Sequence, residues 1–423
     1  MILPPQMIAA TGGIRRPLRN TYVQLGDSKL AYSFSGGGNN VLAKNFGITH
    51  WGQRYTHSRW RSPKEANFGV AGDTTSQVLQ RIDAALAYPA DVFVVLAGSN
   101  DRRNGTKLED SKMQLARIIR QLRNANKLVI VVAETPKSLS GSFGQTMAQA
   151  LDNYAYRMWI KQTVALWEGV IVVDPWAEMV DPTSQYYEPL PGMVSDGAHQ
   201  TCIGAEIMGR HVAMALNRLS NFPGGLPISN SMYNLDQAIT GSLTPNPMML
   251  GTGGTIQSGT NPQAGSVLAD NYTFGVEGGP ATGISTKLYK EASPRVGELQ
   301  VIEITGTPTA DNLRLHVYNN ATFSYLSAND KCRQLAWMES QGPGANQVSA
   351  TMVMNGSYAL ADGDINDLTS PYPSKRIVGT LETPSYTHGS ATSLTQRVTI
   401  GLIKGATVNM KVKIGQMGVS KFV

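Results

Sequence analysis

In the first 220 residues, short apolar runs alternate with segments whose apolar positions recur at helical spacing. Unbroken apolar runs are typical of strands that are buried on both faces of a sheet. The strand candidates are Thr21–Gly26, Asp91–Gly98, Lys127–Glu134 and Gly169–Pro175. The helix candidates are Lys107–Asn124, Thr146–Ala165 and Ile203–Leu219. This alternation predicts an α/β domain, with a doubly wound parallel sheet and helices on both of its faces.

The pattern changes after a cluster of prolines and glycines at Asn221–Pro227. Beyond this cluster, apolar and polar residues alternate over short segments separated by Gly, Asn and Asp, which is typical of antiparallel strands. The segments are Leu299–Thr305, Leu313–Tyr318, Gln347–Met354, Gln396–Ile403 and Thr407–Ile414. We therefore predict an all-β domain, a jelly-roll-like sandwich of antiparallel sheets.

Length and charge support this division of the chain. The 423 residues exceed the usual size of one domain. We expect an N-terminal lead segment at 1–20, an α/β domain at 21–221, a linker at 222–240 and a β domain at 241–423. The whole net charge of +6 belongs to residues 1–222, which hold 23 basic and 17 acidic residues.

Composition excludes several classes of protein. Eight basic residues lie between Arg102 and Lys127 without an interleaved aromatic residue, which favours a solvated helix face over a nucleic-acid site. No apolar run is long enough to span a membrane. The two cysteines, Cys202 and Cys332, exclude a disulfide framework and are expected to be small buried residues. The N-terminus lacks the pattern of a signal peptide, so the chain stays in the cytoplasm, leaves it by another route or has been trimmed.

Four segments of the predicted α/β domain carry the groups that a serine nucleophile needs. Ser28 follows a strand in a Gly-Asp-Ser sequence, and Gly72 precedes a helix, where its backbone N–H can face an anion. Asn100 follows another strand and has a neutral amide donor. Asp196 and His199 lie three residues apart, before the last predicted helix. Because open α/β sheets bind ligands at the carboxyl ends of their strands, we expect these groups to meet there.

Together these segments resemble the sequence blocks of the SGNH (GDSL-type) hydrolase family over residues 21–215. The matching blocks are Gly26-Asp27-Ser28, Gly72, Gly98-x-Asn100-Asp101 and Asp196-x-x-His199. The resemblance implies that Ser28 is the nucleophile, His199 the general base and then acid, and Asp196 the residue that orients the imidazole. It also implies an oxyanion hole made of the backbone N–H groups of Ser28 and Gly72 and the side-chain amide of Asn100. No cofactor or metal is expected.

The order of residues argues against an α/β-hydrolase, in which the serine lies in Gly-x-Ser-x-Gly and the acid lies well before the histidine. Here Lys29 and Leu30 follow Ser28, and the acid and the histidine share one turn. The chain departs from the SGNH pattern in two places. No glycine follows shortly after Ser28, and Gln200 stands where a proline often follows the histidine. Both departures concern the shape of the pocket rather than the reacting groups.

Aromatic residues cluster in two segments near these motifs. We interpret them as the rim of a sugar-binding site, since aromatic faces offer apolar contact to sugar rings; burial in the core is the alternative. The residues are Trp51, Tyr55, Trp60, Trp176, Tyr186 and Tyr187. A metal site at His50 and His57 is disfavoured, because no acidic partner is spaced beside them.

The candidate residues support hydrolysis of an acyl ester through an acyl-serine intermediate. The β-rich half resembles, in its pattern alone, the jelly-roll or carbohydrate-binding domains that accompany esterases of bacteriophage tail fibres and tailspikes. Our main hypothesis is a phage tail esterase, in the virion or extracellular, that removes O-acetyl groups from a bacterial surface or capsular polysaccharide. The β domain would then position the acetylated polysaccharide, form a homotrimer interface or contact other tail proteins.

Two other hypotheses stay open. One is a carboxylesterase for small esters with a purely structural β domain. The other is a polysaccharide-binding adhesin without activity, which the intact set of candidate residues disfavours. Release of acetate from purified capsule or O-antigen would distinguish the first hypothesis from the small-ester carboxylesterase.

Overall fold

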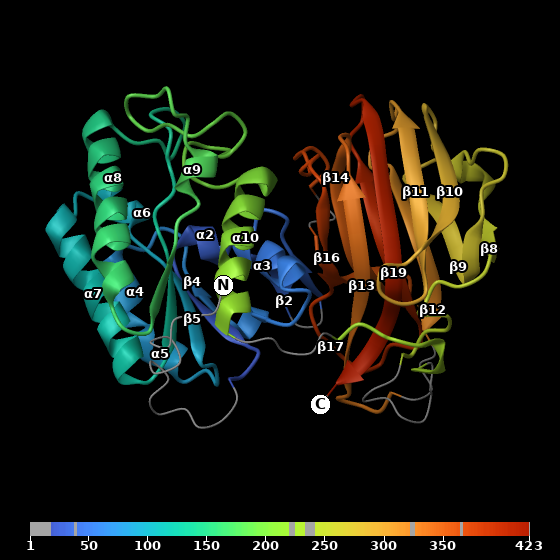
Figure 1. The fold of residues 1–423 in the computed structure, drawn as a ribbon, viewed down its shortest axis with the longest axis horizontal. Coiled ribbons are helices and arrows are strands. Elements are labelled where there is room, and N and C mark those ends of the chain that lie inside the picture. Colours follow the sequence, from blue (N-terminus) through green and yellow to red (C-terminus); the bar gives the residue numbers. More distant parts are fainter. Residues whose placement is uncertain are drawn as a thin grey trace. The chain divides into compact units, whose positions relative to one another are not determined.

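The structure is a computed structural model that describes residues 18–37, 40–219, 225–232, 242–321, 326–363 and 367–422. The chain divides into two compact units, coloured along the sequence in Figure 1. The first comprises Met1–Phe34 and Phe46–Pro223, and the second comprises Ser35–Asn45 and Gly224–Val423. Residues 35–45 therefore belong to the second unit, whereas the sequence-based boundaries assign them to the α/β domain. The predicted linker at 222–240 lies largely outside the described residues.

The first unit contains a parallel five-stranded sheet in the order β4-β1-β5-β6-β7. Its strands are β1 (Tyr22–Gly26), β4 (Asn67–Gly69), β5 (Val92–Leu96), β6 (Leu128–Val132) and β7 (Val170–Val173). Sequence analysis predicts all of them except β4, which is only three residues long. After β1, the next strand of this sheet along the chain is β4, which pairs with one edge of β1. The following strand, β5, pairs with the opposite edge of β1. The two turns after β1 and β5 are therefore neighbours at a switch point of the sheet, where ligands bind in such folds.

Helices cover both faces of this sheet, which confirms the doubly wound α/β prediction (Figure 1). On one face, side chains of α4 (Thr75–Gln80), α5 (Ile82–Leu86), α7 (Leu108–Asn124) and α8 (Met147–Gln162) share a core with alternate strand residues. On the other face, α3 (Ile48–Tyr55), α9 (Trp176–Met179) and α10 (Cys202–Leu219) do so. The short helices α2 (Ser28–Ala31) and α6 (Ser99–Arg103) directly follow β1 and β5.

The second unit is built from two mainly antiparallel sheets. One has the order β10-β11-β19-β13-β16, with β17 paired to β13, and the other has the order β2-β3-β15-β14-β18-β12-β9-β8. The strands are β2 (Phe34–Gly37), β3 (Asn40–Ala43), β8 (Gly253–Ile256), β9 (Leu268–Glu277), β10 (Ile284–Ala292), β11 (Glu298–Gly306), β12 (Arg314–Ala321), β13 (Lys331–Gln341), β14 (Ala345–Met354), β15 (Ser357–Ala361), β16 (Ile377–Glu382), β17 (Tyr386–Thr387), β18 (Leu394–Leu402) and β19 (Val408–Phe422).

Buried glutamines join the two sheets of the second unit. Gln334 of β13 donates to the carbonyl of Arg397 in β18 at 2.7 Å and accepts from its N–H at 3.2 Å. Gln300 of β11 accepts from the N–H of Ala269 in β9 at 3.0 Å. Both glutamines are fully buried, so each amide completes backbone hydrogen bonds between the layers. The all-β prediction is thus confirmed, whereas the jelly-roll topology stays a prediction.

Two features expected from composition can be checked in the described residues. Cys202 and Cys332 are both buried, as predicted. In the part of the chain that the structure describes, no helix is long and apolar enough to cross a membrane.

One carboxylate links four strands of the eight-stranded sheet. Glu277 of β9 accepts from Arg314 of β12 and Arg397 of β18, each at 3.1 Å, and from the hydroxyl of Tyr358 in β15. Hydrogen bonds from His316 and Tyr358 and the charge of Arg314 lower the pKa of Glu277 to about 2. A carboxyl group whose pKa is lower in the folded state stabilises the fold above its ordinary pKa and loses that effect as pH falls.

We therefore expect Glu277→Gln to lower the thermal unfolding midpoint of the second unit at pH 7. The difference from the wild-type protein should shrink as pH falls from about 4.5 to about 2, where the native carboxylate becomes protonated. Unfolding followed by circular dichroism over a series of pH values tests this. A difference that stays constant over that range would show that the charge of Glu277 is not what stabilises the sheet.

Candidate active site

The turn after β1 presents Ser28 at the first position of α2. A Cβ atom on Gly26 would lie 2.0 Å from the carbonyl oxygen of Leu96, so only glycine allows β1 and β5 to end this close together. Asp27 caps α2, because its Oδ1 accepts the N–H of Lys29 at 3.0 Å. The Gly-Asp-Ser sequence thus fixes the position of the hydroxyl by close packing and by a helix cap.

The turn before α10 brings an acid and a base to that hydroxyl. Nε2 of His199 lies 2.8 Å from Oγ of Ser28, and Nδ1 lies 2.7 Å from Oδ2 of Asp196. The other oxygen of Asp196 accepts the N–H groups of Ala198 at 3.2 Å and His199 at 2.9 Å. Burial raises the pKa of Asp196, but these hydrogen bonds outweigh it and hold the pKa below its ordinary value. Asp196 is therefore ionised at neutral pH and favours the imidazole tautomer with its proton on Nδ1.

The predicted oxyanion donors lie after β1, β4 and β5. Gly72 has a φ of +86°, which favours glycine, and open space surrounds its Cα on the side where a Cβ would be. The amide of Asn100 donates one hydrogen to the carbonyl of Asp73 at 3.0 Å, which fixes the orientation of its NH₂ group. In the described residues, the backbone N–H groups of Ser28 and Gly72 have no acceptor. Unpaired donors at the edge of a sheet can bind a developing oxyanion.

Arg81 holds these segments together. Its guanidinium donates to the carbonyl of Gly26 at 2.5 Å and to that of Phe68 at 2.9 Å, and it forms an ion pair with Asp73. The loop that carries Gly72 is thereby tied to the end of β1, two residues before Ser28.

Replacing Asn100 with alanine is expected to lower kcat for an ester substrate by about 10²- to 10³-fold, because one preformed oxyanion donor is lost. The change should be read from steady-state kinetics on p-nitrophenyl acetate. Asn217→Ala, at an exposed position of α10, is a matched control that should keep the wild-type rate. An Asn100→Ala variant within about threefold of the wild-type kcat would exclude Asn100 from the oxyanion hole.

Three of the aromatic residues proposed as a sugar-binding rim belong to the core instead. Trp51 and Trp60 are completely buried and Trp176 is 5% exposed, so none offers a ring face to a ligand. Trp51 fits because Gly209 of α10 has no side chain; a Cβ there would lie 2.4 Å from that of Trp51. The interpretation of these three residues was wrong.

The three tyrosines of the same proposal are half-buried. The hydroxyl of Tyr55 donates to buried Glu206 at 2.6 Å, which is a structural contact. Tyr187 stacks on Tyr154 with ring centroids 4.1 Å apart, and Tyr186 precedes it. Their contact with a sugar stays a prediction.

Sequence reasoning missed two aromatic rings that flank the histidine. The centroids of Tyr32 and Phe143 lie 5.2 and 5.0 Å from that of His199, and the two residues are 39% and 37% exposed. Arg103 is exposed, and its guanidinium lies 4.5 Å from the ring centroid of Phe143. Tyr32 could have been considered from its place four residues after Ser28. Phe143 lies in a polar, glycine-rich loop far from every motif, which gave no signal.

Gln200, one of the two departures from the family pattern, proves to be part of the site's framework. Its buried side-chain amide donates to the carbonyl of Lys29 at 2.9 Å and to that of Phe46 at 3.0 Å. The residue after His199 is thus bound directly to the turn that carries Ser28, a role that proline could not fill.

Comparison with protein families adds an independent observation to this geometry. Residues 25–201 match the model of the GDSL-like Lipase/Acylhydrolase family. This match supports the GDSL family for the first unit. The matched range begins just before the Gly-Asp-Ser turn and ends just after His199, so the GDSL-like unit includes every block of the candidate site. No curated protein sequence matches the chain.

Several solved structures are similar to about half of the chain. A GDSL-like lipase from Bacteroides thetaiotaomicron is 15% identical and covers 51% of this chain and 98% of its own, with a TM-score of 0.36. The lipase/acylhydrolase from Enterococcus faecalis is 18% identical and covers 48% and 98%, with a TM-score of 0.37. An acetyl xylan esterase is 14% identical and covers 46% and 98%, with a TM-score of 0.35.

Proposed function

We propose that this protein is a serine esterase that hydrolyses acyl esters through an acyl-serine intermediate. The observation that carries the proposal is the continuous relay from Ser28 through His199 to Asp196, with distances of 2.8 and 2.7 Å. The GDSL family match supports ester hydrolysis by the first unit.

Each residue of the relay has one task in the proposed reaction. The hydroxyl of Ser28 attacks the ester carbonyl while His199 takes its proton on Nε2. Asp196 stabilises the imidazolium that forms, and the donors of Ser28, Gly72 and Asn100 bind the oxyanion. The imidazolium then protonates the leaving alcohol. Water, activated by the same imidazole, releases the acid from the acyl-serine.

We further propose that the substrate is an O-acetylated polysaccharide of a bacterial surface or capsule, and that the protein acts as a phage tail component. Tyr32 and Phe143 support a sugar as the substrate, because partly exposed aromatic rings beside a catalytic base provide apolar contact next to the scissile ester. A β-rich unit of about the same size as the enzyme unit supports a role in binding the polymer or in forming a trimer.

Treatment of purified capsule or O-antigen, followed by measurement of released acetate, tests the substrate. The wild-type protein is expected to release acetate, and Ser28→Ala is expected to release none. Hydrolysis of p-nitrophenyl acetate without release from any polysaccharide would favour the small-ester carboxylesterase. Binding to polysaccharide without hydrolysis of either substrate would favour the adhesin.

A further inference from the structure

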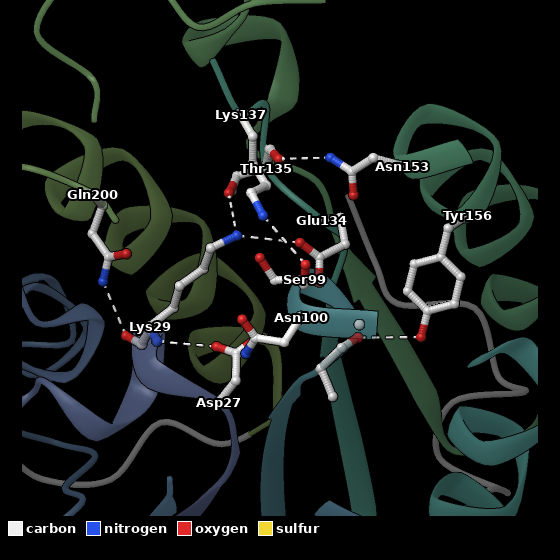
Figure 2. Close-up of polar contacts among 12 residues, drawn as sticks. Asp27, Lys29, Ser99, Asn100, Glu134, Thr135, Lys137, Asn153, Tyr156 and Gln200 are labelled. Atoms are coloured by element: carbon white, nitrogen blue, oxygen red, sulfur yellow. Dashed lines mark hydrogen bonds and ion pairs between the residues drawn. The ribbon is translucent and has the colours of Figure 1, made fainter. Parts of the chain in front are cut away.

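The segment Glu134–Ser138, which follows β6, contacts three of the four segments that carry candidate site residues: the turns of Ser28, of Asn100 and of Asp196 and His199. Glu134 and Thr135 accept hydrogen bonds from the ammonium group of Lys29, at 3.2 and 2.9 Å (Figure 2). Lys29 directly follows the nucleophile Ser28. The backbone of Thr135 is itself held by α8, where Asn153 donates to its carbonyl at 3.2 Å.

The same segment also contacts the turn that carries Asn100 and the turn that carries Asp196 and His199. The ammonium group of Lys137 donates to the carbonyl of Ser99 at 3.3 Å, one residue before Asn100 (Figure 2). The N–H of Ser138 donates to the carbonyl of Gly197 at 2.8 Å, between the acid and the base of the relay. Four of these five consecutive residues thus bind the turn of the nucleophile, the turn of Asn100 and the turn of the acid and the base.

The charges in this network are withdrawn from water. Lys29 and Glu134 are each 1% exposed, Lys137 is 4% exposed, and Asp27 is completely buried. Moving an ion pair out of water is unfavourable, and an apolar pair of similar volume is often equally stable or more stable. Stability alone therefore gives little reason to keep Lys29 and Glu134 here. A direct reason is that an ammonium group with fixed acceptors holds the neighbouring serine in one place.

We propose that Glu134–Ser138 is a positioning segment for the esterase reaction, an inference that rests on the function proposed above. Through Lys29, Glu134 and Thr135 fix the turn of the nucleophile. Through Ser99, Lys137 fixes the turn of the oxyanion donor. These residues touch neither the substrate nor the reacting atoms; they set the distances between the groups that do.

The first test replaces the ion pair with apolar residues in the full-length protein, Lys29→Met with Glu134→Leu, so that no unpaired charge stays buried. We expect kcat for p-nitrophenyl acetate to fall about 10- to 100-fold with KM changed less than about threefold, since misplacement by about 1 Å costs that much. The thermal unfolding midpoint should stay within a few degrees or rise. Arg333→Met with Glu382→Leu removes a buried pair of 2.8 Å in the second unit and should keep the wild-type kcat.

The second test uses the charge of Lys137. Burial, together with the charge of Lys29, lowers the pKa of Lys137 to about 8; Glu134 and Asp27 oppose this shift and Arg103 adds to it. The kcat of the wild-type protein should therefore fall as pH rises through about 8, where the ammonium group loses its proton and its role as a charged donor. Lys137→Met should show a kcat about 10-fold lower at pH 7 and no such decline. Lys137→Arg should recover most of the rate and keep it at pH 9.

The outcomes separate this inference from the function on which it rests. Wild-type kcat in the Lys29→Met, Glu134→Leu variant overturns the positioning role alone. If that variant does not fold, Thr135→Val and the pH profiles of the Lys137 variants decide instead, and unchanged kcat and pH dependence in these overturn it. A folded wild-type protein that neither hydrolyses esters nor reacts with a fluorophosphonate overturns both proposals.

Discussion

Replacing Ser28 with alanine is expected to lower kcat for p-nitrophenyl acetate by roughly 10⁴- to 10⁶-fold, which leaves only the contribution of substrate binding and the oxyanion donors. Within the part of the chain that the structure describes, the hydroxyl of Ser28 makes one side-chain hydrogen bond, to His199 at 2.8 Å. Its loss should therefore change the free energy of unfolding by about 1 kcal/mol or less. Steady-state kinetics and thermal unfolding on the same preparation measure both quantities.

Ser76→Ala is the matched control, since Ser76 lies exposed in α4 of the same unit. It should retain wild-type activity. A fluorophosphonate should label the wild-type protein on Ser28 and leave the Ser28→Ala variant unlabelled. Label on another serine, or activity of Ser28→Ala near the wild-type level, would mean that the nucleophile lies elsewhere.

The architecture of the first unit could be predicted because its central strands β1, β5 and β6 are short and buried on both faces. Such strands have unbroken apolar sequences, as in β5 and β6. The amphipathic helix α7 has apolar residues at helical spacing. The strand β4 left no signal, because three half-buried residues are too few for a pattern. The excursion of residues 35–45 into the second unit was also missed. It is set by strand pairing, in which Val41 of β3 lies beside Leu360 of β15, and pairing between distant segments is not encoded locally.

The candidate site could be located from the sequence because each sequence motif follows a strand of the parallel sheet or precedes a helix that packs on it. Its surroundings could not be predicted, since they depend on which side chains meet across the fold. Trp51 is buried because Gly209 of α10 leaves room for it. Tyr32 and Phe143, in contrast, approach His199 from separate loops. Lys29 carries a charge that composition alone would place in water. Its partner Glu134 is 105 residues away, so only the fold reveals the buried pair.

Replacing Asp196 with asparagine is expected to lower kcat by about 10²- to 10⁴-fold with little effect on KM. An asparagine oxygen can still accept the N–H groups of Ala198 and His199, so the turn should keep its shape. The amide nitrogen would replace Oδ2, which accepts from Nδ1 of His199 at 2.7 Å. A nitrogen donor there favours the tautomer with the proton on Nε2, which cannot take the proton of Ser28. The imidazolium would also lose its counter-ion.

Asp181→Asn is the control for this change, because Asp181 also accepts a backbone N–H and a side-chain donor, both from Thr183, in a loop without a candidate catalytic residue. It should keep the wild-type kcat. The rate of Asp196→Asn should also recover as pH rises, since hydroxide can replace the missing base and the neutral imidazole no longer needs to form a cation. A variant with wild-type kcat at pH 7 would show that His199 is held and charged without Asp196, and the relay would then end at the histidine.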